Sequence, residues 1–308
     1  MWQNVRSKVI FLPMLASLLI CSPARSDVSE ILKTVYGKSP VMLQGRLFFG
    51  KCEGNGIDVW DGKQTTSFWK DEHCGPTSIV EYRERGNNHL LVACYYANSL
   101  VELDMSGKEI RRIDRDNKGK PFTGPNLITS DGAGGYYFSA SGAYNVKAPI
   151  TGTVMHLKAH SSRPVEVANT IHYSNGLTLT ADKKNLLVAE MFAGRILSFP
   201  VREDGSLGTR EVWARLQDLA PPTPEMDAYN GPDGLRLGSD GNYYIAQSGS
   251  GRVLVVSADK KLVRIITVPS KYVTDIGFGE HGADEVFVYG AFEQWKAPFP
   301  AAIYVWKK

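Results

Sequence analysis

The amino-acid sequence predicts an all-β fold, a six-bladed β-propeller with four-stranded antiparallel blades, and three observations support this prediction. Amphipathic helical periodicity is nearly absent after residue 40. Short runs of β-forming residues, separated by turns rich in Gly, Asp and Asn, recur down the whole chain. One four-strand unit begins six times, which indicates radial repetition rather than one continuous sheet.

The first 26 residues resemble an export signal. Arg6 and Lys8 carry positive charge, an apolar run follows over residues 9–20, and small residues lie around Ala24 where a signal peptidase needs them. The apolar run is too short to span a bilayer, which takes about 20 residues. We therefore expect a signal peptide at 1–26, one propeller domain at 27–308, a periplasmic or secreted location, and no membrane association after signal removal.

The net charge and the cysteine content limit which partners, disulfides and metal sites are expected. The formal net charge is +3 and the charged residues are interspersed, so nucleic acid is not an expected partner. Outside the signal, the cysteines Cys52, Cys74 and Cys94 predict one disulfide and one buried free thiol, with the pairing left open. Their spacing does not match a zinc site. The oligomeric state is also left open.

The repeating unit is clearest after Pro232. Its four strands are expected at 234–237, 243–247, 253–257 and 262–268. They fit within about 40 residues, the size of a propeller blade. Equivalent units begin near Ser39, Pro76, Pro125, Asn175 and Tyr272.

The last unit, residues 274–306, contains only three strand candidates, and residues 29–36 form a further candidate before the first unit. We expect this N-terminal segment to supply the missing outer strand of the last blade. The ring would then be closed, with no long unpaired edge at the junction.

Polar residues recur where the predicted blades approach the central axis. In such a blade the first strand lines the axis, and its start lies on the same face as the end of the second strand. The strand starts place Asn126, Asn175 and Asp233 at equivalent positions in three blades. Convergent amide and carboxylate oxygens are typical Ca²⁺ ligands, although any one of these residues alone is ordinary turn chemistry.

Several motifs resemble the SMP-30/gluconolactonase/LRE-like family. They are Asn175-Gly176-Leu177, Pro232-Asp233-Gly234-Leu235, Gly124-Pro125-Asn126 and Phe278-Gly279. The resemblance implies a six-bladed propeller with one divalent ion, usually Ca²⁺, at the top of the central channel, and hydrolysis of sugar lactones or related compounds. It also implies that Asn175 and Asp233 are metal ligands and that Asn126 binds metal or substrate.

Two positions depart from the family pattern. Lys38 stands where the family has a Glu, and Leu127 stands where an Asp often follows Asn126. Two interpretations follow. Either Lys38 replaces the ion and pairs with Asp233, or Glu53 or Glu190, at predicted ends of second strands, supplies the missing carboxylate for Ca²⁺ or another divalent ion.

The resulting functional prediction is an exported hydrolase that opens a lactone or ester, with a small carbonyl compound as substrate. With an ion present, the metal would polarise the carbonyl and Asp233 or Glu190 would accept a proton from water. Without one, Lys38 would stabilise the developing oxyanion. The alternative is a metal-free ligand-binding or interaction propeller.

Aromatic residues and one histidine are candidates for the substrate pocket. Tyr95, His172 and Tyr229 are the residues we assign to it. Tyrosines in such positions either line a pocket or fill the core between blades. His172 has no evident partner for a catalytic triad, and the sequence around Ser141 lacks the GxSxG setting, so a serine hydrolase is not expected.

Overall fold

The computed structural model describes residues 28–84, 86–224, 226, 228–293 and 299–308. The predicted signal peptide at 1–26 lies outside the described residues. Regular structure in the described part is almost entirely β, with one short helix, α1 (Leu216–Leu219), and one 3₁₀ turn, η1 (Met191–Ala193). None of the described helices has the length and apolar character needed to cross a bilayer.

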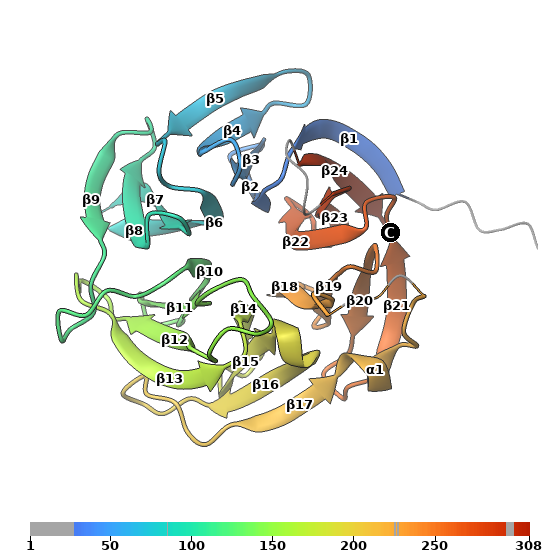
Figure 1. The fold of residues 1–308 in the computed structure, drawn as a ribbon. Coiled ribbons are helices and arrows are strands. Elements are labelled where there is room, and N and C mark those ends of the chain that lie inside the picture. Colours follow the sequence, from blue (N-terminus) through green and yellow to red (C-terminus); the bar gives the residue numbers. More distant parts are fainter. Residues whose placement is uncertain (1–27, 85, 225, 227, 294–298) are drawn as a thin grey trace, which may run out of the picture.

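Four sheets have the predicted form of four antiparallel strands in chain order (Figure 1). The first contains β2 (Lys38–Leu43), β3 (Arg46–Lys51), β4 (Gly56–Trp60) and β5 (Thr65–Lys70). The second contains β6 (Pro76–Glu84), β7 (Asn87–Cys94), β8 (Ser99–Asp104) and β9 (Glu109–Ile113). The third contains β10 (Pro125–Ser130), β11 (Tyr136–Ala140), β12 (Gly152–Leu157) and β13 (Val165–Ile171). The fourth contains β14 (Ser174–Leu179), β15 (Asn185–Glu190), β16 (Arg195–Pro200) and β17 (Glu211–Arg215).

The remaining strands form one eight-stranded sheet rather than two separate four-stranded sheets. They are β18 (Gly231–Leu237), β19 (Tyr243–Ser248), β20 (Arg252–Val256), β21 (Leu262–Thr267), β22 (Tyr272–Gly279), β23 (Gly282–Ala291), β24 (Pro300–Lys307) and β1 (Val28–Val35). A single paired position, Ser248 opposite Tyr272, joins β19 to β22. This one backbone contact makes two four-stranded groups continuous.

The N-terminal strand belongs to the same sheet as the C-terminal strand. β1 pairs antiparallel with β24, from Val28 opposite Trp306 to Val35 opposite Pro300. The Tyr289 hydroxyl on β23 also donates to the Val35 carbonyl at 2.7 Å. Residues from the two ends of the chain therefore share one set of backbone hydrogen bonds.

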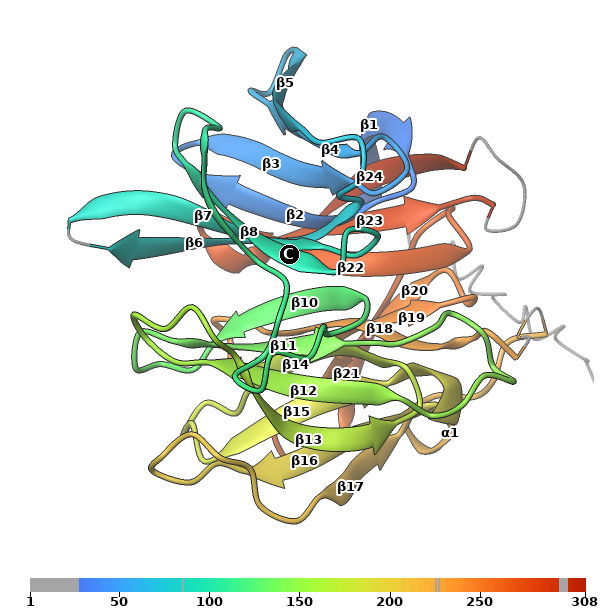
Figure 2. The ribbon, with the colours of Figure 1, turned by 60° about the vertical axis from the view of Figure 1, so that its left-hand side comes forward.

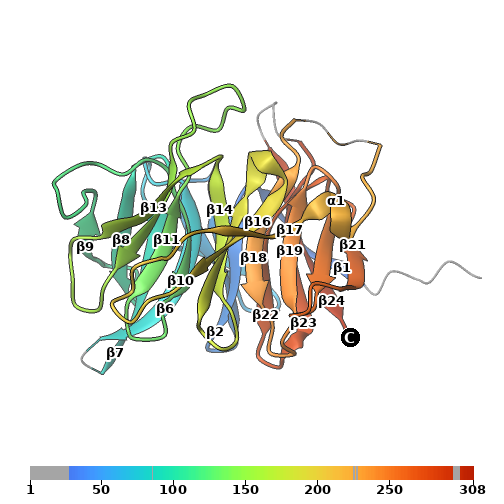
Figure 3. The ribbon, with the colours of Figure 1, turned by 90° about the horizontal axis from the view of Figure 1, so that it is seen from below.

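The sheets are arranged radially, with the first strand of each four-stranded group innermost (Figure 1). The innermost strands contact each other in the order β2, β6, β10, β14, β18 and β22, and β22 also contacts β2. Figure 2 shows the sheets stacked face to face, and Figure 3 shows the strands side-on across a disc. The fold is thus propeller-like, with its strand starts directed toward a common centre.

Apolar side chains fill the spaces between neighbouring sheets, where they are shielded from water on both sides. Between the first and second sheets, for example, Phe48 and Ile57 pack with Leu90 and Val101. On the other side of the first sheet, Phe49 packs with residues of β23 and β24. The core is therefore a series of layers between sheets, and it leaves the central axis to polar side chains.

The cysteine count predicted one disulfide and one buried thiol, and the structure confirms this. Cys74, just before β6, is bonded to Cys94 at the end of β7, and Cys52 is free and buried. Burial raises the pKa of the Cys52 thiol to about 12, so this thiol is not a ready source of thiolate.

Candidate functional site

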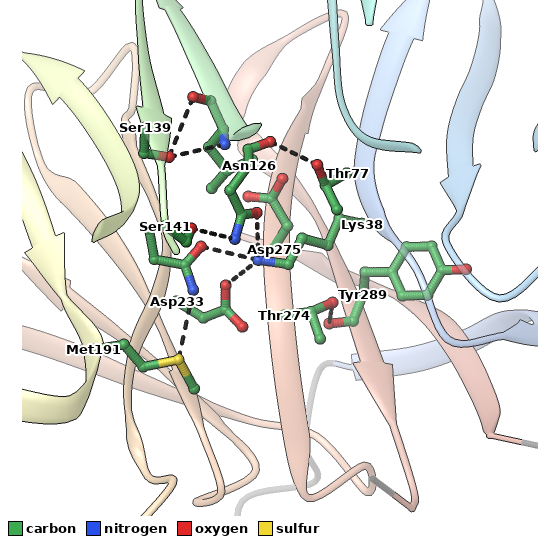
Figure 4. Close-up of polar contacts among 12 residues, drawn as sticks. Lys38, Thr77, Asn126, Ser139, Ser141, Met191, Asp233, Thr274, Asp275 and Tyr289 are labelled. Carbon is green, nitrogen blue, oxygen red and sulfur yellow. Dashed lines mark hydrogen bonds and ion pairs between the residues drawn. The ribbon is translucent and has the colours of Figure 1, made fainter. Parts of the chain in front are cut away.

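Four side chains from four innermost strands meet at one point, and Lys38 lies at its centre (Figure 4). The Lys38 Nζ donates to Asn126 Oδ1 at 3.1 Å and to Asn175 Oδ1 at 2.9 Å. It also forms an ion pair with Asp233 Oδ1. These four residues, here called the Lys38 cluster, are each at most 3% exposed to solvent.

A local irregularity at the start of each innermost strand directs these side chains inward. The pairing register shifts between Lys38 and Val41, between Pro125 and Ile128, and in the same place in the other innermost strands. Such bulges twist a strand and re-aim its side chains, and they are frequent beside functional sites. The repeated polar strand starts in the sequence thus correspond to one repeated backbone distortion.

The glycines that follow Asn175 and Asp233 have a packing role. A Cβ on Gly176 would lie 2.4 Å from the Asp233 carbonyl oxygen and 2.3 Å from the Leu235 nitrogen. A Cβ on Gly234 would lie 2.7 Å from the Asp275 Cα. Only glycine allows the innermost strands to approach this closely, and that approach brings Asn175 and Asp233 within reach of Lys38.

Neighbouring groups fix the orientation of the two amides. Asn126 Nδ2 donates to Ser141 Oγ at 3.0 Å, and Asn175 Nδ2 contacts Met191 Sδ at 3.5 Å. Each amide oxygen is then left to face the ammonium, which only donates hydrogen bonds. The three donors of Lys38 are matched by three oxygen acceptors.

Burial dominates the electrostatics of Asp233. Removal of water raises the pKa of the Asp233 carboxyl to about 6, although the adjacent Lys38 ammonium favours the ionised form. The charge of Asp275 adds to the rise. Asp275 is itself paired with Arg236 at 2.7 Å and accepts from the Ser39 backbone N–H at 3.2 Å.

A cavity of about 210 Å³ opens beside the Lys38 cluster, and we call it the central cavity. Two members of the cluster, Lys38 and Asn126, line it. Most of the remaining wall is aromatic. The other lining residues are Tyr36, Cys52, Glu53, Thr77, Tyr95, Tyr96, Tyr144, Tyr173 and Phe299.

Neither of the two predicted alternative carboxylates joins the Lys38 cluster. Glu53 is exposed and lines the central cavity, where it accepts a hydrogen bond from the Tyr96 hydroxyl at 2.9 Å. Glu190 is buried, but it accepts from the His172 backbone N–H at 2.8 Å and pairs with Arg195. Glu190 therefore anchors the chain before β14, and it is not part of the cavity lining formed by the described residues.

Of the three residues predicted to line the substrate pocket, one lines the central cavity within the described part of the chain. Tyr95 lines the central cavity, whereas Tyr229 packs against Tyr144 with ring centroids 5.3 Å apart. His172 packs edge-on against Phe192, and its Nε2 is buried with no hydrogen-bond partner among the described residues. Neither His172 nor Tyr229 is among the described residues that line the cavity.

Sequence reasoning missed part of the aromatic wall. Tyr36 lines the cavity and was not expected there, whereas Tyr173, which precedes Asn175, was a weaker candidate for the pocket and also lines it. Each stands two residues before a member of the Lys38 cluster, Lys38 and Asn175 respectively. That shared spacing was the available signal. Tyr144 and Phe299 come from loops outside the repeated pattern, so no periodic signal marked them.

The residues present do not fit a resident divalent ion. The oxygens of Asn126, Asn175 and Asp233 converge on the Lys38 ammonium, which occupies the position an ion would need. Ca²⁺ prefers about 6 to 8 oxygen ligands, and the cluster offers one carboxylate. Within the described part of the chain, no group of three or more His, Cys, Asp or Glu side chains is placed to hold a metal.

Comparison with solved structures supports the fold. The luciferin-regenerating enzyme superposes with a TM-score of 0.71 at 16% identity, over 90% of this chain and 94% of that chain. A calcium-binding protein, regucalcin, from Agrobacterium tumefaciens gives a TM-score of 0.70 at 15% identity, over 91% and 94%. A gluconolactonase from Xanthomonas campestris gives a TM-score of 0.69 at 19% identity, over 90% and 88%.

Sequence comparison gives more specific relatives. The SMP-30/Gluconolactonase/LRE-like region model matches residues 36–291. The lactonase drp35 of Staphylococcus saprophyticus is 28% identical over 68% of this chain and 61% of its own length. Lactonase drp35 of Staphylococcus aureus strain MRSA252 is 29% identical over 46% of this chain and 41% of its own length. The matched regions thus span less than two thirds of these relatives.

Proposed function

Since the chain belongs to the SMP-30/gluconolactonase/LRE-like family, we propose that it is a hydrolase that opens a small lactone or ester in the central cavity. One observation carries this proposal: the buried Lys38 ammonium, held by three oxygen atoms, lines that cavity. The relation to proteins named lactonases supports the reaction class.

Lys38 would stabilise the negative charge that develops on the carbonyl oxygen. Among its three acceptors, Asn126 also lines the cavity and lies farther from Nζ than Asn175 does. A substrate oxygen that enters the cavity would take the place of Asn126 Oδ1 as acceptor, because Asn126 is the acceptor of Lys38 that lines the cavity. A fixed cation in a site that excludes water stabilises such an oxyanion strongly, because the surroundings need not reorganise during the reaction.

Asp233 is the basic group of the site. With a pKa of about 6, its carboxylate is mostly ionised at neutral pH, yet it is more basic than an exposed Asp. A base with a pKa near the working pH is well suited to accept a proton from attacking water and, once protonated, to return it to the ring oxygen that leaves. Asp233 is not among the described residues that line the cavity, so the attacking water would have to reach it beside Lys38. Because Lys38 fills the converging oxygens, no step of the proposed mechanism passes through a metal ion.

The test compares hydrolysis of simple lactones and esters by the wild type, Lys38→Met and Asp233→Asn. We expect Lys38→Met to lower kcat/KM by about 10² to 10³, the scale of removing one oxyanion donor. We expect Asp233→Asn to lower it by about 10² to 10⁴. The exposed pair Lys261 and Asp259 provides matched controls, Lys261→Met and Asp259→Asn, which should retain activity.

A lone charge left buried is costly, so either single variant risks misfolding. The double variant Lys38→Met/Asp233→Asn removes both charges; it should fold, as judged by circular dichroism, and remain inactive. Turnover by this double variant would overturn the proposal. An absence of turnover by the wild type on every lactone and ester would favour the alternative, a metal-free ligand-binding or interaction propeller in which Lys38 replaces the family's Glu.

We also propose the organisation of the whole chain. Residues 27–308 form one six-bladed domain, in which the eight-stranded sheet counts as two blades and β1 closes the ring. Residues 1–26 act as a signal peptide for export to the periplasm or the medium. N-terminal sequencing of protein from cell fractions tests the export proposal, and an uncleaved protein confined to the cytoplasm would contradict it.

A further inference from the structure

The lining of the central cavity is dominated by aromatic rings. Among the residues that the structure describes, eleven line the cavity, and six of these are aromatic and come from five separate segments of the chain. They are Tyr36, Tyr95, Tyr96, Tyr144, Tyr173 and Phe299. Aromatic walls offer flat apolar surface, and they interact best with other rings in stacked or edge-to-face geometry.

The hydroxyl groups of this wall are largely used within the protein. The Tyr95 hydroxyl donates to the Gly142 carbonyl at 3.1 Å, and the Tyr173 hydroxyl donates to Tyr95 at 3.1 Å. The Tyr96 hydroxyl donates to Glu53 at 2.9 Å. These three donors are therefore already engaged, and a substrate that used them would first have to break a protein hydrogen bond.

The other polar lining groups are committed in the same way. The Thr77 hydroxyl donates to the backbone carbonyl oxygen of Asn126 at 2.8 Å. The Asn126 side chain uses its nitrogen on Ser141 and its oxygen on Lys38, and in the proposed mechanism only the bond to Lys38 is given up, to the substrate carbonyl. A molecule with many hydroxyls would lose its bonds to water here and regain few, which costs binding free energy.

The charges around the cavity disfavour an anionic substrate. The Lys38 charge is compensated by Asp233, and Glu53 adds a negative charge to the lining. A carboxylate or phosphate on the substrate would meet Glu53 without a free cation among the described lining residues.

The size of the cavity limits the size of the substrate. Its volume of about 210 Å³ is small beside the 300 to 1,000 Å³ typical of ligand pockets.

From this lining we infer that the preferred substrate is a small, uncharged lactone or ester that carries a flat aromatic ring, and that polyhydroxylated sugar lactones are poor substrates. This inference rests on the proposed function, because it names the substrate class of the same site. Lys38 would receive the carbonyl oxygen while the tyrosine wall receives the ring.

Three δ-lactones with the same reactive ring test the inference. Isochroman-3-one carries a fused aromatic ring, δ-valerolactone carries no substituent, and glucono-1,5-lactone carries several hydroxyl groups. We expect kcat/KM to be highest for isochroman-3-one and at least about tenfold lower for glucono-1,5-lactone, since a ring contact worth about 1.4 kcal/mol corresponds to a factor of ten. A preference for glucono-1,5-lactone would overturn the inference and leave the proposed hydrolase standing.

Tyr96 allows a substitution that leaves the core intact, because its side chain lines the cavity and is 50% exposed. Tyr96→Ala removes the ring, and Tyr96→Phe keeps the ring and removes only the hydroxyl. We expect Tyr96→Ala to raise KM for isochroman-3-one several-fold and to raise KM for δ-valerolactone much less, with Tyr96→Phe keeping the preference for isochroman-3-one. Equal effects of Tyr96→Ala on both lactones would contradict a ring-binding wall.

A binding measurement separates this inference from the hydrolase proposal. The lactam analogue of isochroman-3-one keeps the ring and the carbonyl but resists hydrolysis, and gluconolactam is the matched polyhydroxylated probe. Calorimetry should show at least about tenfold tighter binding of the aromatic lactam. If no lactone is hydrolysed but this preference appears, the hydrolase proposal fails and the assigned ligand class stands; if the preference is absent, the inference fails.

Discussion

Lys38 occupies a position in which one buried positive charge is matched by one buried negative charge and two amide oxygens. Its ammonium has three donors, and Asn126, Asn175 and Asp233 accept all three. Such a pair is sensitive to the loss of either member, because the remaining charge would be buried without compensation. The residue-level chemistry of the centre therefore depends on this lysine and its three oxygen acceptors.

The first residue-scale prediction concerns calcium. Replacing Lys38 with Glu exchanges the ammonium for a second carboxylate among three converging oxygens, which is the ligand chemistry that Ca²⁺ prefers. Titration calorimetry on chelator-treated protein should show saturable Ca²⁺ binding by Lys38→Glu and none by the wild type. Lys38→Met is the control, since it removes the charge without adding a ligand. Saturable Ca²⁺ binding by the wild type, abolished in Asp233→Ala, would show that Lys38 does not exclude the ion.

The second residue-scale prediction concerns pH. The pKa of Asp233 is raised to about 6, so the carboxylate gains a proton and loses its basicity as pH falls through that value. We expect kcat/KM for a lactone to fall tenfold per pH unit below about 6 and to level off above it.

Stability provides the control for the pH profile. Between the ordinary pKa of 3.8 and the folded value of about 6, the folded state holds a proton on Asp233 that the unfolded chain has released. The stability contribution of this group is therefore fully present below pH 4 and is lost as pH rises through 6. Acidification should therefore lower the activity while it increases the contribution of Asp233 to stability. An acid limb that coincides with unfolding by circular dichroism would refute the assignment to Asp233.

At the scale of the element, the innermost strands combine a bulge at their start with close backbone packing. Gly176 lies against the backbone of Asp233 and Leu235, which places β14 directly beside β18. The bulge re-aims the side chain before the glycine, and the glycine permits the contact with the next strand. Together they convert a repeated turn-like motif into a converging set of oxygens.

Substitution of Gly176 tests this account. Gly176→Ala places a Cβ within 2.4 Å of two backbone atoms, so the strands must separate. We expect a loss of about 3 kcal/mol or more in the free energy of unfolding, at the upper end of overpacking effects. Gly241→Ala is the control: its Cβ meets open space, and only its positive φ of 79° opposes the change. The control should lose about 1 kcal/mol in urea titrations, and equal losses at both sites would count against the packing role.

At the scale of the whole molecule, residues from the two ends of the chain hold one sheet together. β1 covers the outer edge of β24, and Ile31 and Leu32 pack onto the apolar layer that also contains Phe49. Without β1, β24 would present a long unpaired edge, which is a template for aggregation.

Deletion of residues 28–35 tests the contribution of β1. We expect the melting temperature to fall by about 10 °C or more, since a domain of this size loses about 2 to 4 °C per kcal/mol, and the deleted strand contributes both hydrogen bonds and apolar burial. A synthetic peptide of residues 28–35 should recover part of the loss by pairing with β24, whereas a scrambled peptide should not. An unchanged melting temperature would contradict a structural role for this strand.

The all-β class, the repeating four-strand unit and the polar strand starts follow from the amino-acid sequence alone. These features are local: strand alternation and turn residues depend on neighbouring positions, and repetition makes a weak local signal visible. Asn126, Asn175 and Asp233 were predictable as a converging set for that reason. A Lys38–Asp233 pair was predictable, as one of two interpretations, only because Lys38 departs from the pattern of the family that the motifs resemble.

The contacts of the side chains at the centre, by contrast, become known from the tertiary structure. Glu53 and Glu190 had equal standing in the sequence, but Glu190 is held by His172 and Arg195, and Glu53 lies among the aromatic residues of the cavity. The same holds for Tyr144 and Phe299, which reach the cavity from non-repeating loops. The physical reason is that acceptor competition and cavity shape depend on groups far apart in the chain, and no local pattern in the sequence encodes their distances.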